Sequence, residues 1–178
     1  MDDLIARAEE GNVYAQFNLG KRYYVGSGVP QDNLKAVFWW MKAAQNGYVY
    51  AQYNLGFCYG SGQGVVQDHE KAVYWYEKAA QQGYARAQYN LGFCFGTGCG
   101  VPINPEKAVY WIRNAAEQNH ATAQYNLGVC FEKGRGVPQD VEKAIYWWKR
   151  AAALGHEDAQ NSLTLFKRDL KTGKYYRR

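Results

Sequence analysis

The hexapeptide AQYNLG at residues 51–56 decides the fold of this chain, because it returns at a constant interval of 36 residues. The same block, with Phe or Tyr at its third position, begins at Ala15, Ala51, Ala87 and Ala123, and a degenerate copy begins at Ala159. A fixed period in this range indicates stacked supersecondary units in place of a single globular core. Such stacks usually act through the extended surface that they build.

Each unit is predicted to contain two helices joined by a glycine-rich turn. In the first unit the helices are expected at about 13–25 and 33–46. Glycine pairs between them suit a helix C-cap and a tight turn, and an Asp or Asn stands where the second helix needs its N-cap. The first helix also carries a glycine in its middle, which costs about 1 kcal/mol relative to Ala and so indicates the close approach of another helix. These mid-helix glycines are Gly20, Gly56, Gly92 and Gly128.

The second helices carry alanines and large apolar residues one turn apart, a stripe typical of a buried helical face. The four sets are Ala36/Trp40/Ala43, Ala72/Tyr76/Ala79, Ala108/Ile112/Ala115 and Ala144/Trp148/Ala151. We therefore expect an all-α fold in one solenoid domain spanning residues 1–178. Its parts are an N-terminal capping helix at 1–12, full repeats at 13–48, 49–84, 85–120 and 121–156, and a C-terminal capping helix with a basic tail at 157–178.

Residues 51–84, AQYNLGFCYGSGQGVVQDHEKAVYWYEKAAQQGY, closely resemble the Sel1-like repeat, a relative of the tetratricopeptide repeat. The shared pattern combines A-x-x-N-L-G, G-x-G-V-P and K-A-x-x-W-x-x-x-A-A and runs through 13–156. The resemblance implies a right-handed α-solenoid of helix-turn-helix repeats that acts as an adaptor or scaffold in multiprotein assemblies. Many members of this family are bacterial, including envelope and secreted proteins.

By resemblance to tetratricopeptide repeats, the first helix of each unit lines a concave face that binds a protein or peptide. Aromatic residues there suit binding hot spots, and the Asn column can either pair with a bound main chain or bond a neighbouring helix within the fold. Lys21 and Arg86 favour a peptide that carries an acidic group besides apolar anchors. The predicted partner-binding residues are Tyr14, Phe17, Asn18, Lys21, Tyr50, Tyr53, Asn54, Phe57, Arg86, Tyr89, Asn90, Phe93, Tyr125 and Asn126.

A second aromatic column directly precedes the first Trp of each second helix, where many Sel1-like units have a charged residue. If it lies on the outer face, it forms a second contact surface; the alternative is that neighbouring repeats cover it. Its members are Phe38, Tyr74, Tyr110 and Tyr146.

Three of the four cysteines share one helical column and are interpreted as small packing residues. They are Cys58, Cys94 and Cys130. Cys99 falls in the glycine loop, where we expect it to be exposed, either as a free thiol or paired with Cys94. This pattern of cysteines, most of them interpreted as unpaired packing residues, favours a reducing cellular compartment.

The net charge is +5, and residues 157–178 hold six basic residues against three acidic ones. Binding of nucleic acid or an anionic membrane through this tail is the alternative function, although six scattered basic residues make it less favoured than protein binding. The basic residues are Lys167, Arg168, Lys171, Lys174, Arg177 and Arg178.

No local motif indicates catalysis, a metal site or a cofactor, so the chain is predicted not to be an enzyme, and a small-molecule enzyme is the least favoured alternative. The first residues do not resemble a signal peptide, which favours a cytoplasmic location; an envelope or secreted location applies if the chain is a processed fragment. We expect a monomer or weak self-association.

Overall fold

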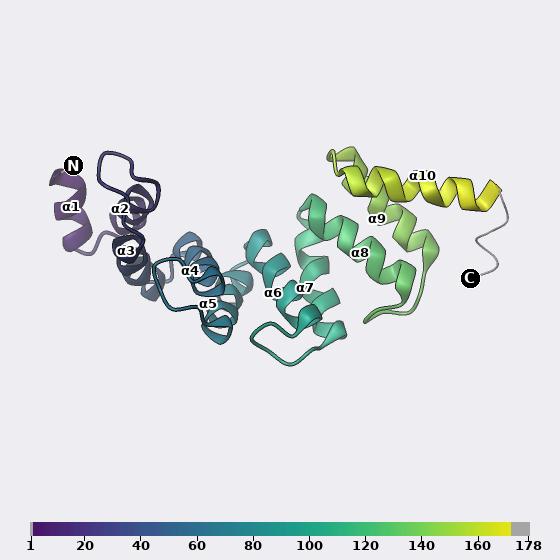
Figure 1. Cartoon of the computed structure of the whole chain (residues 1–178), viewed down its shortest axis with the longest axis horizontal. Helices are drawn as coiled ribbons and strands as arrows, with labels where there is room; N and C mark the ends of the chain where they lie inside the picture. The colour runs from purple at the N-terminus through teal and green to yellow at the C-terminus, as the bar shows by residue number, and fades with distance from the viewer. Residues whose placement is uncertain (1, 172–178) are drawn as a thin grey trace.

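The computed structural model describes residues 2–171, with side chains through residue 168, and these residues form ten α-helices and no strand (Figure 1). The helices succeed one another along the long axis of the molecule, and each packs chiefly on its neighbours in sequence. The predicted all-α solenoid is confirmed, whereas the end of the predicted basic tail, residues 172–178, lies outside the described residues. The helices are α1 (Asp2–Glu9), α2 (Val13–Val25), α3 (Asn33–Gln45), α4 (Val49–Ser61), α5 (His69–Gln81), α6 (Ala85–Thr97), α7 (Pro105–Glu117), α8 (Ala121–Lys133), α9 (Val141–Ala153) and α10 (Glu157–Lys171).

Local residues set both ends of the turn within each repeat, as predicted. In the second repeat, Gly62 ends α4 with φ at +74°, and its N–H donates to the carbonyl of Cys58. The Asp68 carboxylate then accepts from the N–H of Lys71 at 2.9 Å and begins α5. The other repeats use the same residues or their equivalents, so one turn geometry recurs four times.

The mid-helix glycines lie where the second helix of the same repeat crosses the first. A Cβ added at Gly56 would lie 2.5 Å from the ring of Tyr76, and one added at Gly20 would lie 2.6 Å from the ring of Trp40. Such distances leave no room for a side chain, so the predicted close approach is confirmed.

The second glycine of the turn has a role in the second, third and fourth repeats that the sequence did not suggest. At Gly64, φ is +72°, and a Cβ there would overlap the carbonyl group of Asn33 at the start of α3. Gly100 and Gly136 meet the preceding second helix in the same way. These glycines therefore lie at contacts between successive repeats.

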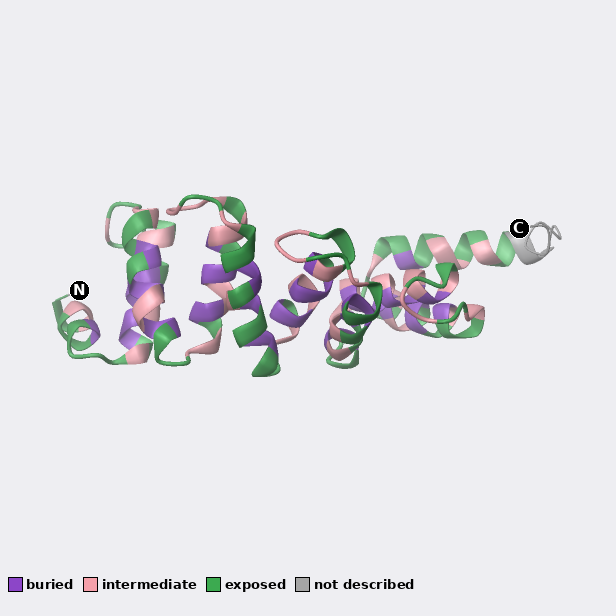
Figure 2. Cartoon of the chain, turned by 90° about the horizontal axis from the view of Figure 1, so that it is seen from below, coloured by how far each residue is buried: buried purple, intermediate pink, exposed green. Residues whose placement is uncertain are grey.

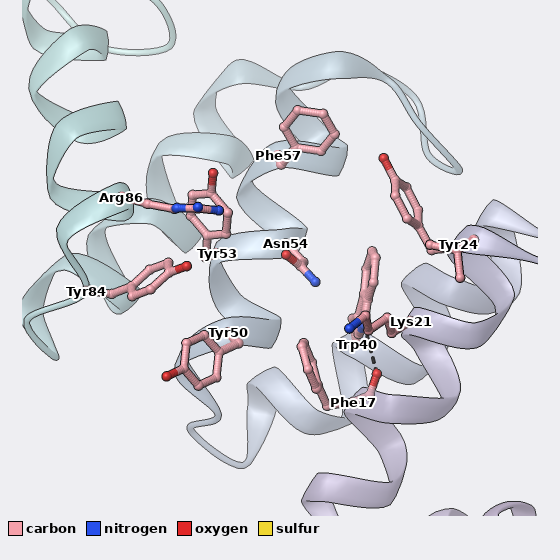
Figure 3. Close-up of a pocket in the computed structure, with 11 residues that line it drawn as sticks. Phe17, Lys21, Tyr24, Trp40, Tyr50, Tyr53, Asn54, Phe57, Tyr84 and Arg86 are labelled. Atoms are coloured by element: carbon pink, nitrogen blue, oxygen red, sulfur yellow. Dashed lines mark hydrogen bonds between the residues drawn. The ribbon is translucent and has the colours of Figure 1, made fainter. Parts of the chain in front are cut away.

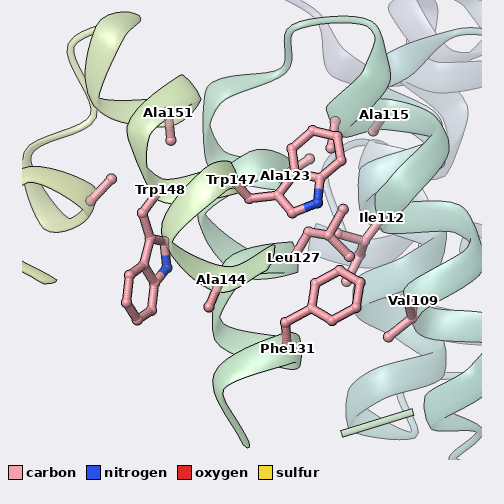
Figure 4. Close-up of a cluster of buried hydrophobic side chains, with 12 residues drawn as sticks. Val109, Ile112, Ala115, Ala123, Leu127, Phe131, Ala144, Trp147, Trp148 and Ala151 are labelled. Atoms are coloured by element: carbon pink, nitrogen blue, oxygen red, sulfur yellow. The ribbon is translucent and has the colours of Figure 1, made fainter. Parts of the chain in front are cut away.

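The core is a chain of small clusters, one after another along the stack, and the buried residues lie on the facing sides of the helices (Figure 2). Figure 4 shows the cluster in which Ile112 of α7, Leu127 and Phe131 of α8, and Trp147 of α9 gather. A buried glutamine joins each repeat to the preceding helix: the Nε2 of Gln52, for example, donates to the carbonyl of Ala44 at 3.2 Å. The predicted apolar stripe on the second helices is confirmed.

Candidate functional site

Three cavities follow one another along the first helices of the repeats, and together they form the candidate groove. The first, of about 440 Å³, lies between α2, α4 and the start of α6. The second, of about 360 Å³, lies between α4, α5 and α6, and the third, of about 600 Å³, between α6, α7 and α8. Phe57 lines the first and second cavities, and Phe93 lines the second and third. The two half-exposed phenylalanines thus separate adjoining parts of one groove.

The first cavity brings together half of the predicted partner-binding residues. Figure 3 shows aromatic rings from three helices around it, with the side chains of Lys21 and Arg86 on opposite sides. Its lining contains no acidic residue. Tyr50 and Phe57 expose 46% and 40% of their surface and are therefore the rings most available to a ligand. The predicted residues that line this cavity are Phe17, Lys21, Tyr50, Tyr53, Asn54, Phe57 and Arg86.

Four inner aromatics are paired with rings that the site prediction missed. Phe17, Tyr53, Tyr89 and Tyr125 lie 5.0, 5.1, 5.0 and 4.7 Å, centroid to centroid, from Tyr48, Tyr84, His120 and His156. The partners form a column of aromatic residues 36 apart in the sequence, which was the available signal.

Burial and neighbouring groups shift the pKa values of two members of these ring pairs, His120 and Tyr84. The His120 Nδ1 accepts a hydrogen bond from the N–H of Ala123 at 3.2 Å, which requires a neutral ring nitrogen. Burial lowers the pKa of His120, and the charge of Arg86 lowers it further. Burial raises the pKa of Tyr84, against the lowering effect of the same guanidinium. Arg86 thus enters the groove as a cation beside neutral rings.

The Asn column divides between the two roles proposed for it. The Asn126 side chain donates to the hydroxyl of Tyr89 at 3.1 Å. Asn54 lines the first cavity, whereas the exposed Asn18 lies in a separate hollow beside α1. Asn126 therefore bonds within the fold, and Asn54 is placed to meet a bound main chain.

Other predicted residues lie away from the first cavity. Asn90 and Phe93 line the second, and Phe93 and Asn126 line the third. Tyr14, Tyr89 and Tyr125 line none of the three; Tyr14 is 66% exposed and packs edge-on against Tyr48.

The outer aromatic column is exposed, so the expectation that neighbouring repeats cover it is wrong. Each ring stands nearly perpendicular to the Trp that follows it, with centroids 5.0–5.2 Å apart. A cation also lies over three of these rings: Lys42 over Phe38 at 4.9 Å, Lys78 over Tyr74 at 5.5 Å and Arg150 over Tyr146 at 5.9 Å from the centroid. The exposed fractions are 52% for Phe38, 51% for Tyr74, 59% for Tyr110 and 53% for Tyr146.

All four cysteines are free thiols. Cys58 and Cys94 are buried, and burial raises the pKa of each thiol to about 11. The expected exposure of Cys99 is wrong: it is partly buried, because it packs against the cluster that contains Cys94 and lines the second cavity. Within residues 2–168, no group of three His, Cys, Asp or Glu side chains is arranged to hold a metal ion. No described helix is long and apolar enough to cross a membrane.

Comparison with known proteins identifies the repeats. The family model of the Sel1 repeat matches residues 13–48, 49–84, 85–120 and 121–156, and the chain therefore belongs to the Sel1 repeat family. Proteins built from this repeat generally mediate protein–protein interactions and are typically not enzymes. A comparison with curated proteins found no match.

Solved structures of bacterial Sel1 repeat proteins superpose well on the chain. A protective antigen of uropathogenic Escherichia coli is 40% identical with a TM-score of 0.89, over 91% of this chain and 35% of that one. A Sel1 repeat protein from Oxalobacter formigenes is 37% identical with a TM-score of 0.84, over 92% and 48%. Cysteine-rich protein B of Helicobacter pylori, at 22% identity and a TM-score of 0.59, shares the fold over 74% and 94%. The chain thus spans a third to a half of the length of the first two relatives.

Proposed function

We propose that the groove binds an extended segment of a protein partner and that the chain acts as an adaptor or scaffold. The observation that carries this proposal is the first cavity, where exposed rings of α4 stand between two cations from different repeats. Aromatic residues in a concave, partly desolvated setting are typical hot spots of protein interfaces. Lys21 and Arg86 add attraction for a carboxylate, because the cavity lining supplies no acid to neutralise them.

The test compares two double variants, one in the groove and one in the outer aromatic column. Tyr50→Ala with Phe57→Ala removes the exposed rings of the groove, and Tyr74→Ala with Tyr110→Ala removes two similarly exposed rings of the outer column. A partner captured from lysate by the wild type is purified, and its affinity for each variant is measured by calorimetry. Truncation of two hot-spot side chains should weaken binding at least about tenfold. The outer variant serves as the control and should bind as the wild type does.

The opposite result would overturn the proposal. If the groove variant binds as tightly as the wild type and the outer variant does not, the outer column is the contact surface. Circular dichroism on both variants establishes that the helices remain, so that a loss of affinity reports on the removed rings.

A further inference from the structure

The third cavity is the largest of the three, and two positions beside it that hold rings in the first repeat hold smaller side chains in the third. Trp40 and Tyr24 pack together in the first repeat, with centroids 5.3 Å apart, and both line the first cavity. Their counterparts in the third repeat are Ile112 and Gly96, which both line the third cavity.

The other repeats retain at least one larger group at these two positions. The second has Tyr76 with Gly60, and the fourth has Trp148 with Glu132. The second and third cavities are lined by equivalent positions, and their volumes are about 360 Å³ beside Tyr76 and about 600 Å³ beside Ile112. Space that the chain fills with its own rings elsewhere is therefore open in the third repeat.

The floor of this cavity is apolar and suits a ring from another molecule. Val109, Ile112 and Val129 contribute aliphatic side chains, and Gly96 exposes helical backbone. A Cβ added at Gly96 would come no nearer than 3.6 Å to Ala108, so the helix surface here is not crowded. A large aromatic side chain would bury its apolar area here, which favours binding.

The charge of the groove indicates what kind of chain carries that ring. The linings of the three cavities contain Lys21, Arg86 and Arg135 against one acidic residue, Glu106, a net charge of +2. Lys21 and Arg86 stand on opposite sides of the first cavity (Figure 3), so a carboxylate placed there meets a cation on either side. Complementary charge favours an acidic segment over a basic one.

The two cavities lie at different points along the groove. The first cavity opens between α2 and α4 and the third between α6 and α8, two repeats further on. A segment that reaches both cavities therefore runs in an extended form along the groove.

We infer that the ligand of the groove is an extended acidic segment with a large aromatic side chain in the cavity over Ile112 and a carboxylate between Lys21 and Arg86. This inference rests on the proposed function, because it specifies the segment that the same groove would bind. Ile112 thereby becomes a specificity-determining residue.

The probe is a displayed library of random twelve-residue peptides, selected on the wild-type chain. Enriched peptides should share an aromatic and an acidic residue at a constant separation. The variant Ile112→Trp should bind them at least about tenfold more weakly, because the new ring occupies the cavity. The substitution introduces the residue that Trp40 and Trp148 already place beside the same mid-helix glycine, so the backbone accommodates it.

A double-mutant cycle isolates the contact. Alanine in place of the peptide aromatic should weaken binding to the wild type at least about tenfold and weaken binding to Ile112→Trp little further. The peptide measurement also keeps the inference testable if the protein variant unfolds. The charge reversals Lys21→Glu and Arg86→Glu should remove the preference for the acidic residue.

Two outcomes overturn the inference while the proposed function stands. Selected peptides that bind Ile112→Trp as tightly as the wild type, yet lose affinity for Tyr50→Ala with Phe57→Ala, would place the ligand in the groove but outside the third cavity. Enrichment only of peptides that lack the acidic and aromatic pair would also overturn the inference while the proposed function stands. Peptides indifferent to both variants, or no enrichment at all, would count against the proposed function as well as the inference.

Discussion

Alanine in place of Gly64 is expected to destabilise the chain more than alanine in place of Gly62, although the two glycines lie in one turn. Both have φ near +73°, at +74° for Gly62 and +72° for Gly64, so each substitution forces an L-residue into the left-handed region. Their surroundings differ. A Cβ at Gly62 would lie 3.4 Å from the Cβ of Gln67, whereas a Cβ at Gly64 would overlap the carbonyl group of Asn33 in the preceding repeat.

The magnitudes follow from these two contributions. The left-handed conformation costs a non-glycine residue about 1–2 kcal/mol, and this cost applies to both variants. Overpacking against a backbone that cannot rotate away adds about 1–3 kcal/mol at Gly64. We therefore expect Gly62→Ala to lose about 1–2 kcal/mol and Gly64→Ala about 2–5 kcal/mol. In a chain of this size each kcal/mol lowers Tm by about 2–4 °C.

Thermal and urea unfolding followed by circular dichroism would measure both losses. Asparagine provides the control, because it tolerates the left-handed region and does so in this chain at Asn119, where φ is +62°. Gly62→Asn should be close to the wild type, and Gly64→Asn should remain destabilised because its Cβ still meets the carbonyl group. Equal losses for the two alanine variants would refute the claim that Gly64 lies at a contact between repeats.

The dependence of Tm on pH and the reactivity of the buried thiols provide two further tests. Asp68 and Asp140 each accept hydrogen bonds from the backbone and side chain of the lysine three residues later, which holds the pKa of each carboxyl below its usual range. The stabilisation from these carboxylates is present above their ordinary pKa and is lost as the pH falls through the lowered pKa. The variant Asp68→Asn with Asp140→Asn keeps the capping oxygen, as Asn104 does, and its Tm should fall less than that of the wild type between about pH 5 and pH 2; identical Tm profiles would contradict this. Because burial raises the pKa values of Cys58 and Cys94 to about 11, mass spectrometry should find both unmodified by iodoacetamide near neutral pH and modified after unfolding in urea. Rapid labelling of either thiol in the native chain would contradict its burial.

The helices were predictable from the sequence because local residues decide where they end. Gly62 accepts a backbone conformation that other residues resist, and Asp68 supplies the oxygen that an N-terminal N–H needs. Because the 36-residue period repeats these residues, each helix boundary is predicted four times, and an error at one repeat would disagree with the other three. The role of Gly64 escaped prediction because its cause, the carbonyl group of Asn33, lies in another repeat.

The sequence predicted which face of the helices forms the site, but not which side chains contact one another there. Helical periodicity places Tyr53 and Tyr89 on the inner side, but the rings that pack on them, Tyr84 and His120, come from the loop before the next helix. Periodicity likewise did not predict that the Asn126 amide donates a hydrogen bond to the hydroxyl of Tyr89 in the preceding repeat. Spacing within a helix does not report contacts made by residues 31 to 37 positions apart, and those contacts decide which inner residues remain available to a ligand.

Residues common to every repeat are poor candidates for ligand specificity, because stacking alone accounts for them. Leu55 and its three equivalents are fully buried, and the mid-helix glycines are required by the helix that crosses them. Departures from the pattern have no such explanation. Arg86 stands where the equivalent residues are Tyr14, Tyr50 and Thr122, and Ile112 stands where the others are aromatic. If specificity resides in these departures, exchanging Arg86 or Ile112 for the residue of another repeat should change which segment binds while leaving the stack intact.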